Sequence, residues 1–556
     1  MMQSYPLHSG YPVENLDGLW EFAFRENMIC REERCPEIRF DDVIPVPSCF
    51  DLQLPYRALR GTGFYRKQVN TRAGRIRLTC KGFGFIITAY WDGVRVGESN
   101  LTYSEVSFDF ESAEGRHELI LAVSNVYDSR QAPLLYPYYD FYGYGGLYRS
   151  VELHQLPEYS VDRAEVRIVN AEEGRVRVRL RVSGTLPSPL SATFCFDGTQ
   201  TVEQKLDASP EAEFVLDDKA LWSPESPNLH TVRVQVGESV VTERFGLRTV
   251  KTEGRKLLLN GREIRLKGIC RHESHVLFGV SVPHSLALED VRLLKDLGCN
   301  FVRCVHYPQD SVFLDLCDEL GMLVWEESLG WGNRAEQFLI PEFAEAQKEQ
   351  TRLLTEKSIN HPSIIIWGFL NEGRSNAPES QELYRDLAEI LRSAEDGRLV
   401  SYASMFPDDD HSFALADIIS INRYPGWYAS DQELVRPLSE IEKEMKRLET
   451  MLDERGFGDK PLLISEIGAG AIPGWHDTFR VHWSEEYQSD YVQEACRAIL
   501  GNPRYLGIAV WHFADCRTYA SSYALGRPRS LNNKGVLDEY RRPKLAYGTL
   551  KQAFRG

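Results

Sequence analysis

The sequence lacks the features of membrane-spanning, nucleic-acid-binding and disulfide-rich proteins. Its 556 residues contain no run of 18 or more apolar residues, which argues against a transmembrane helix. The eleven cysteines show no metal-like spacing, so we expect reduced thiols rather than a disulfide framework. Positive charge is scarce: the formal net charge of −17 argues against nucleic acid and anionic membranes as partners.

The first residues also lack the pattern of a secretion signal. The stretch MMQSYPLHSGYPVENLDG has no basic segment followed by an apolar one, so we expect a cytoplasmic protein. Hydrophobic residues make up 43% of the chain and charged residues 26%, as in ordinary globular proteins. At roughly 100–200 residues per domain, the length predicts about three domains.

The first 248 residues have the pattern of two β-sandwiches. Residues 1–155 contain short strand-forming runs separated by turns, such as TGFYRKQV, FGFIITAYWDG, VSFDF and HELILAVSN, and these predict a jelly-roll β-sandwich. In residues 156–248, RVRVRLRV alternates strictly between charged and apolar residues, as a half-buried strand does. The size of this second segment favours an immunoglobulin-like β-sandwich.

In residues 249–556, apolar strands alternate with amphipathic helices such as LEDVRLLKDLG and SVFLDLCDELG. Eight such strands in one segment of this length predict a (β/α)8 TIM barrel, and a doubly wound open sheet is the alternative. The candidate strands are IRLKGIC, NFVRCVHY, MLVWEES, IIIWGFLN, LVSYAS, IISINRY, LLISEIG and LGIAVWHF.

Two of these strands end on a glutamate. IIIWGFLNEG places Glu372 at the end of the fourth strand, and LLISEIGAG places Glu466 at the end of the seventh. The strand ends of a barrel share one rim, and glycoside hydrolysis needs one protonated and one ionised carboxyl group flanking the bond. A glutamate at a strand end is also often the first solvated loop residue. His306, Glu326 and Glu327 end strands too, so position alone does not select the pair.

The motifs WGFLNEG, SEIGAG, INRYPGWY and VWHFAD resemble those of glycoside hydrolase family 2, the retaining β-glycosidases. The resemblance extends over nearly the whole chain through LDGLWEF, LWSPESPNLH, KGICRHESH and RCVHYPQ. It implies that Glu372, next to Asn371, is the acid/base and that Glu466 is the nucleophile. It implies no metal and no organic cofactor. The resemblance leaves the sugar open.

A second set of motifs resembles the members of this family that act on uronic acids. RPRSLNNKGVLDEYRRPK contains an Asn-x-Lys-Gly motif at Asn532, Lys534 and Gly535, which the resemblance assigns to the sugar carboxylate. The same letters also suit a plain turn. YPYYDFYGYGGLYRSV resembles the β-glucuronidase stretch whose aspartate, here Asp140, reaches the sugar. In INRYPGWY the catalytic and sugar-contacting tyrosines fall on Tyr424 and Tyr428.

The chain departs from the β-glucuronidase pattern in two places. Pro425 stands where a tyrosine is usual, and the loop after the third strand, LGWGNRAEQF, is short and carries Arg334. Arg334 is either a surface charge or a contact to the sugar near C4, where glucuronate and galacturonate differ. These departures make a preference for galacturonides a serious possibility. The short loop also predicts an open site that admits bulky or oligosaccharide aglycones.

The expected enzyme is a β-hexuronidase whose substrate is a small glycoside or oligosaccharide with a terminal uronic acid. We expect His272, His306 and Trp511 to line the sugar site, and the helix carboxylates Asp315 and Glu319 to be solvated. We also expect a homo-oligomer. The alternatives are a β-galactosidase or β-mannosidase acting on neutral sugars, and a carbohydrate receptor without catalysis.

Overall fold

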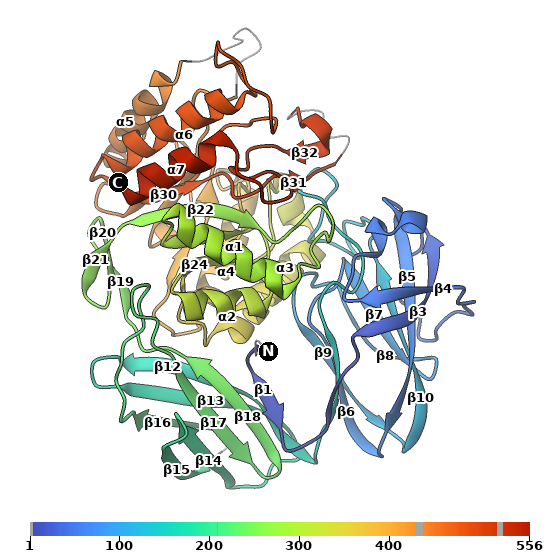
Figure 1. Cartoon of the computed structure of the whole chain (residues 1–556). Helices are drawn as coiled ribbons and strands as arrows, with labels where there is room; N and C mark the ends of the chain where they lie inside the picture. The colour runs from blue at the N-terminus through green and yellow to red at the C-terminus, as the bar shows by residue number, and fades with distance from the viewer. Residues whose placement is uncertain (1–3, 208–209, 429–436, 520–525) are drawn as a thin grey trace.

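The computed structural model describes residues 4–207, 210–428, 437–519 and 526–556, and it forms two β-sandwiches and a barrel (Figure 1). The first sandwich consists of a six-stranded and a four-stranded antiparallel sheet. Aromatic and aliphatic side chains such as Trp20, Tyr65 and Leu121 fill the space between the sheets. The six strands are β4 (Asp42–Val46), β3 (Gly18–Glu26), β5 (Gly61–Thr71), β10 (Gly115–Ser124), β7 (Ile86–Trp91) and β8 (Val94–Ser99). The four are β2 (Val13–Asn15), β11 (Val151–Gln155), β6 (Gly74–Cys80) and β9 (Val106–Ser112).

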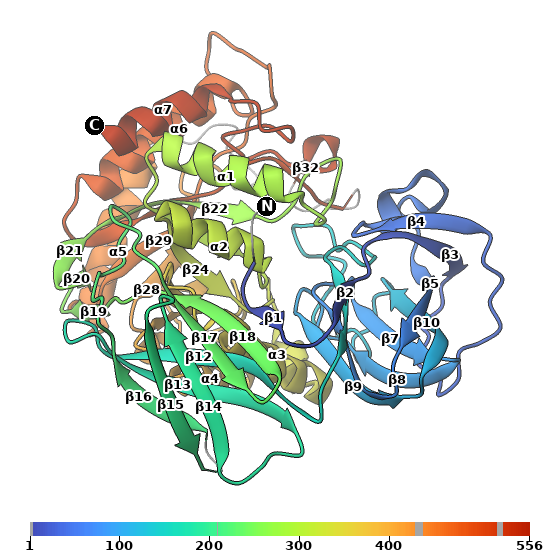
Figure 2. The same cartoon turned by 60° about the horizontal axis from the view of Figure 1, so that its bottom comes forward.

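The second sandwich contains one strand from the start of the chain. Strand β1 pairs antiparallel with β18, so residues before the first sandwich complete a sheet of the second (Figure 2). This five-stranded sheet has the order β1 (Leu7–Ser9), β18 (Ser239–Phe245), β17 (His230–Val236), β14 (Leu190–Phe196) and β15 (Gln200–Leu206). The opposing sheet contains β12 (Tyr159–Asn170), β13 (Arg175–Gly184) and β16 (Glu211–Val215).

The alternation predicted for RVRVRLRV is confirmed in β13. Val176, Val178 and Leu180 are buried in the core of the second sandwich, while the arginines between them point outward and pair with glutamates. We propose residues 1–155, 156–248 and 249–556 as the three domains. Strand β1 belongs to the first of these ranges but completes a sheet of the second domain.

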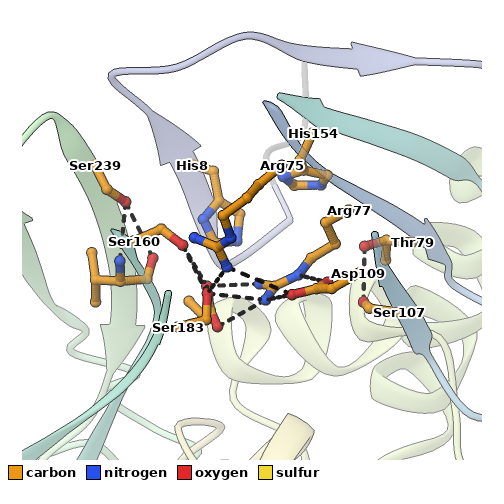
Figure 3. Close-up of polar contacts among 12 residues, drawn as sticks. His8, Arg75, Arg77, Thr79, Ser107, Asp109, His154, Ser160, Ser183 and Ser239 are labelled. Atoms are coloured by element: carbon orange, nitrogen blue, oxygen red, sulfur yellow. Dashed lines mark hydrogen bonds and ion pairs between the residues drawn. The ribbon is translucent and has the colours of Figure 1, made fainter. Parts of the chain in front are cut away.

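Polar side chains join the two sandwiches (Figure 3). Arg75 donates a hydrogen bond to the Ser183 hydroxyl at 3.0 Å, and Arg77 forms ion pairs with Asp109 and Asp162, both at 2.7 Å. Beside them the imidazole of His8, from β1, packs edge-to-face on that of His154 at 5.4 Å. Strand β1 is therefore also part of the contact between the two sandwiches.

The barrel is a closed ring of parallel strands. A small hairpin sheet precedes it: β19 (Val250–Glu253), β20 (Lys256–Leu259) and β21 (Arg262–Ile264). The order of hydrogen-bonded strands in this sheet begins at β26 and ends at β27, which follow each other in the chain and together form one strand of the barrel. The sheet therefore closes into a ring, and the alternative of an open sheet is wrong. The strands are β22 (Leu266–His272), β23 (Phe301–Val305), β24 (Leu323–Glu327), β25 (Ile364–Gly368), β26 (Leu399–Ser401), β27 (Ala403–Ser404), β28 (Ile419–Asn422), β29 (Leu462–Ile467) and β30 (Tyr505–Val510).

Amphipathic helices surround the ring and bury their apolar faces against it. They are α1 (His284–Leu297), α2 (Ser311–Leu320), α3 (Pro341–Ser358), α4 (Gln381–Arg392), α5 (Ser439–Glu454), α6 (Glu485–Leu500) and α7 (Leu545–Arg555). None of the helices in the described ranges is long and apolar enough to cross a bilayer. All eleven cysteines are unpaired thiols.

The expectation that Asp315 is solvated is wrong. Its side chain is 1% exposed and pairs with Arg244 of β18 at 2.8 Å. Helix α2 faces the second sandwich, and this contact covers the carboxylate. Glu319, one turn further along, is 41% exposed and also pairs with Arg244. Burial by a neighbouring domain is not encoded in the helix's own periodicity.

The first sandwich is held against the barrel by aromatic packing. Tyr103 stacks on Tyr307 with ring centroids 4.0 Å apart, and Tyr139 and Tyr144 belong to the same buried cluster as Leu329 of the barrel. This packing fixes the aromatic loop between β10 and β11, which carries Asp140, at the carboxyl ends of the barrel strands.

Candidate active site

A cavity of about 840 Å³ opens at the carboxyl ends of the barrel strands. Glu372 and Glu466 both line it, as do Asp140 and Tyr138 from the loop of the first sandwich. The other lining residues are Trp331, Gly332, Arg334, Arg374, Met405, Phe406, Asn422, Arg423, Tyr424, Pro425, Tyr428, Glu440, Lys443, Glu444, Arg447, Trp511 and Arg527. The structure thus brings the two predicted carboxylates to one space, where a single ligand can contact both.

The two carboxylates have different hydrogen-bond partners. Glu372 follows β25 with a backbone φ of 53°, a conformation uncommon for residues other than glycine, and accepts a hydrogen bond from the Asn422 amide at 2.9 Å. Glu466, within β29, accepts one from the Tyr424 hydroxyl at 2.6 Å and an ion-paired one from Arg303 at 2.8 Å. Glu466 is therefore the carboxylate whose negative charge is directly stabilised.

These environments separate the protonation states of the pair. Burial, with the nearby charge of Glu466, raises the pKa of Glu372 from 4.5 to about 8. Burial also raises the pKa of Glu466, but Arg303 and Tyr424 oppose that rise. At neutral pH Glu372 therefore holds its proton while Glu466 is the group stabilised as an anion, which is the division of roles that acid and nucleophile need.

Arg303, in the middle of β23, connects the residues under the cavity. Besides Glu466, its guanidinium donates to the Asn371 side-chain oxygen at 2.8 Å and pairs with Glu327 at 3.1 Å. The nitrogen of the Asn371 amide is buried and has no hydrogen-bond partner among the described residues. Asn371 shares Arg303 with Glu466 and precedes Glu372 in the chain, although it is not among the residues that line the cavity. An unpaired buried donor at this position is a group that a ligand hydroxyl can satisfy.

A cationic cluster lies where the first sandwich meets the last barrel loop. Asp140 pairs with Arg527, whose Nε lies 2.9 Å from Oδ1, and accepts a hydrogen bond from the Asn532 amide at 2.9 Å. The Lys534 ammonium lies 3.3 Å from the Asn532 oxygen and 5.3 Å from the ring centroid of Tyr428. Burial, followed by the charge of Arg527, holds the pKa of Lys534 well below its usual range.

The three predicted aromatic contacts differ in position. Trp511 lines the cavity, whereas His272 and His306 lie behind it and are not among the lining residues. His306 stacks on Trp511 at 5.3 Å and bonds Glu327 through Nδ1 at 2.9 Å, and its Nε2 lies 4.0 Å from Glu466. His272 packs edge-to-face on Trp511 at 5.6 Å. Both imidazoles support the wall and the floor of the cavity.

Arg334, on the short loop after β24, lines the cavity with its guanidinium 4.5 Å from the ring centroid of Tyr138. Pro425, the other residue that departs from the β-glucuronidase pattern, lines the same cavity and lies between Tyr424 and Tyr428 in the chain.

Comparison of the sequence with profiles of known protein families assigns the chain to one of them. Residues 250–556 match the sequence profile described as "Glycosyl hydrolases family 2, TIM barrel domain", and residues 156–248 match the profile "Glycosyl hydrolases family 2". The first of these matches alone covers more than half of the chain. The chain belongs to glycoside hydrolase family 2.

Individual relatives resemble this chain along nearly all of its length. The β-glucuronidase of Streptococcus agalactiae is 26% identical over 95% of this chain and 94% of its own. The crystal structure of a β-galacturonidase from Eisenbergiella tayi bound to galacturonate has 32% identity and a TM-score of 0.89, covering 100% of this chain and 99% of that one. A β-glucuronidase structure from Faecalibacterium prausnitzii, at 23% identity and a TM-score of 0.87, shares the fold.

Three residues of this family 2 site were missed by sequence reasoning: Arg303, Asn422 and Arg527. A signal existed for Arg303, because an arginine inside an apolar barrel strand must find buried partners. Asn422 is the last residue of β28 and stands inside the motif INRYPGWY, two places before Tyr424, but no role was assigned to it. Arg527 stood in the quoted loop but was not distinguished from its neighbour Arg529, which pairs with Glu539 instead.

Proposed function

We propose that this family 2 glycoside hydrolase is a retaining, exo-acting β-hexuronidase that hydrolyses β-D-glucuronides, β-D-galacturonides or both. The observation that carries the proposal is that two carboxyl groups in opposite environments line one cavity together with Arg527 and Asp140. The buried Asn532 and Lys534 are not among the lining residues, but hydrogen bonds connect them to Asp140 at the cavity wall. The carboxyl pair accounts for cleavage of a glycosidic bond. The cluster of Lys534, Arg527 and Asn532 accounts for selection of a sugar that carries a carboxylate.

In the proposed reaction, a Glu466 oxygen attacks the anomeric carbon while Glu372 gives its proton to the leaving oxygen. The glycosidic bond breaks and a glycosyl ester forms on Glu466. Glu372, now ionised, takes a proton from water, and the water oxygen displaces the ester and releases the sugar with retained configuration. This sequence requires the carboxyl groups to lie about 5–5.5 Å apart.

The other residues bind and orient in this scheme. Tyr424 holds the nucleophile through its 2.6 Å hydrogen bond, and the unpaired Asn371 amide donates to the 2-hydroxyl group of the sugar. Trp511 forms a wall of the sugar site, backed by His306 and His272. Tyr428 and Asp140 contact the sugar at the end where Lys534 meets its carboxylate. The residues named here need no metal or organic cofactor for the chemistry.

Burying the ammonium group of a lysine without an excess of nearby anions costs free energy of desolvation. The carboxylate of a bound uronate offsets this cost. Lys534 is 1% exposed, and Asp140 nearby is already paired with Arg527. A sugar carboxylate placed between the two cations completes the charge balance of the cluster. Neutral sugars supply no such group, which is why we favour uronides over the alternative of a β-galactosidase or β-mannosidase.

For the choice between the two uronides, we propose that Arg334 favours galacturonides by donating to the C4 hydroxyl. The support is its place in the cavity wall beside Tyr138, and the similarity to the β-galacturonidase from Eisenbergiella tayi. One added charge-assisted hydrogen bond changes discrimination by about 1.5–3 kcal/mol, or roughly ten- to a hundredfold.

The test is to assay aryl β-glucuronide and aryl β-galacturonide side by side with wild type and Arg334→Ala. We expect a higher kcat/KM for the galacturonide, and a smaller ratio in the variant. Turnover of a neutral aryl galactoside with no turnover of either uronide would reject the uronide proposal. Lys534→Ala separates the same alternatives, because it leaves a neutral-sugar enzyme unimpaired.

We further propose a terminal uronic acid of a small glycoside or oligosaccharide as the ligand, and a cytoplasmic homo-oligomer as the working form. Sedimentation of the purified protein tests the assembly. Neither nucleic acid nor membrane has a part in this proposal.

A further inference from the structure

The cavity is larger than one sugar needs, and its far end has a composition of its own. Since Glu372 protonates the leaving oxygen in the proposed mechanism, the departing group lies on the Glu372 side of the cavity. That side is formed by the loops after β25, β27 and β28 and by the first turns of α5. At about 840 Å³ the whole cavity lies near the upper end of the range for small-ligand sites, about 300–1,000 Å³.

Four cations line this leaving-group side: Arg374, Arg423, Lys443 and Arg447. Three of them are paired with acidic side chains. Lys443 lies 2.6 Å from Glu440, while Arg423 and Arg447 lie 3.2 and 2.8 Å from Glu444. These three are therefore largely neutralised by their own neighbours.

Arg374 differs from the other three. Its backbone N–H donates to the Asn333 carbonyl at 3.0 Å, but its guanidinium has no ion pair or hydrogen bond among the described residues. The guanidinium lies instead over the Phe406 ring, 5.0 Å from the centroid. In a chain with a net charge of −17, an uncompensated guanidinium on a cavity wall is a specific attraction for an anion.

The surface beside Arg374 is apolar. Phe406 is half-buried and its neighbour Met405 is 40% exposed, and both line the cavity. Aromatic and apolar faces pack against the C–H face of a sugar ring, while a guanidinium binds a carboxylate through two parallel hydrogen bonds. Ring surface and cation are adjacent, so one residue of a saccharide can contact both.

We propose that this side is a subsite for an anionic sugar, so that the residue released from the uronic acid itself carries a carboxylate bound by Arg374. The inference rests on the proposed function and deepens it: the substrates are acidic oligosaccharides in which a terminal β-uronic acid is linked to a second acidic sugar. Phe406 and Met405 contact the ring of this second residue. A sulfate ester presents the same charge and acceptor oxygens.

The experiment compares disaccharides that differ only in the second residue. Each has the preferred terminal β-uronic acid, followed by a sugar with a free carboxylate, the same sugar with that carboxyl reduced to an alcohol, or the alcohol carrying a sulfate ester. The ratio of kcat/KM between charged and neutral substrates is measured for wild type, Arg374→Ala and Arg374→Lys. The matched control is Arg352→Ala, an exposed arginine on α3 that pairs with Glu349 and does not line the cavity.

We expect wild type to prefer the carboxylate over the alcohol by about three- to tenfold, the range for an exposed charge-assisted contact. The ratio falls to about one in Arg374→Ala, is partly kept in Arg374→Lys, and keeps its wild-type value in Arg352→Ala. It also falls between 0.1 and 1 M salt, as the Debye length shrinks from about 10 to 3 Å. A higher ratio for the sulfate ester, lost in Arg374→Ala, supports the subsite with sulfated sugars as its occupant.

A wild-type ratio near one, or a ratio that survives Arg374→Ala, overturns the inference. An aryl uronide assayed in parallel separates this outcome from failure of the proposed function. If the aryl uronide is hydrolysed and the ratio is one, the proposal of an anionic subsite is wrong, while the proposed uronidase activity is supported. If neither the aryl uronide nor the disaccharides are hydrolysed, both are wrong.

Discussion

The unequal environments of Glu372 and Glu466 predict a bell-shaped dependence of kcat/KM on pH. The pKa of Glu372 is raised from 4.5 to about 8, which at 1.36 kcal/mol per pH unit favours its protonated form by about 5 kcal/mol. At pH 7 a group with a pKa of 8 is about 90% protonated, whereas an exposed glutamate is protonated to less than about 1%. Activity should therefore fall above about pH 8, as Glu372 loses its proton.

The fall of kcat/KM at low pH, the acidic limb of the profile, is caused by gain of a proton rather than by loss of one. Below the pKa of Glu466, which burial places above 4.5, the nucleophile takes up a proton and kcat/KM falls. Replacing the acid in Glu372→Gln should remove the alkaline limb and lower turnover by about 10²–10⁴-fold for poor leaving groups. Azide should restore turnover of an activated aryl uronide, because it attacks the glycosyl ester without needing a base.

A matched control separates Glu372 from other carboxyls of high pKa. Burial also raises the pKa of Glu326 to about 7, but this residue lies one place before the end of β24, accepts a hydrogen bond from the Gln309 backbone N–H and does not line the cavity. In Glu326→Gln the alkaline limb should stay. Retention of that limb in Glu372→Gln, with an unchanged midpoint, would refute the assignment of the acid.

The charge of Glu466 contributes to the raised pKa of Glu372, and the glycosyl ester removes that charge. In the intermediate the pKa of Glu372 should therefore fall, which turns the acid into the base that the second step needs. Carboxyl ¹³C NMR of Glu372, before and after trapping with a 2-fluoro uronide, measures this change. A midpoint that stays at the value of the free protein would contradict the coupling.

Three further predictions follow from buried charges. Lys534→Ala should lower kcat/KM for aryl uronides by about ten- to a hundredfold relative to the matching neutral glycoside, and an equal loss on both substrates would reject the carboxylate role. Arg303→Met leaves Glu466 without its cation, so the acidic limb should move to higher pH and thermal unfolding should show a loss of about 3–5 kcal/mol; an unmoved limb would reject this. Burial, followed by the charge of His154, lowers the pKa of His8 from 6.5 to about 3, so the folded state resists protonation and about 2 kcal/mol of stability should be lost between pH 6.5 and 5. Equal pH dependence of Tm in wild type and His8→Asn would refute that last account.

The barrel and sandwiches were predictable because their signals are local. The apolar run of IIIWGFLN and the alternation of RVRVRLRV each show which side chains are buried. A carboxylate at a strand end lies at the rim because the closed ring brings all strand ends there. The two catalytic candidates could therefore be placed in one cavity from topology alone.

The features that were missed depend on partners far away in the chain. Arg303 reaches Glu466 across 163 residues, and Arg527 reaches Asp140 across 387. Asp315 is buried because the second sandwich covers it, although its own helix pattern leaves it outside. Long-range ion pairs of this kind leave no period in the sequence, so only the folded chain reveals them.

The pairing of β1 with β18 has a consequence for synthesis of the protein on the ribosome. At about 5–20 residues per second, strand β1 waits roughly 10–50 s before its partner has been translated. During this interval the first sandwich can fold behind it, while the edge that β1 will occupy does not yet exist. A nascent chain halted before residue 239 should thus expose a short tail that proteases remove, and completion of β18 should protect it.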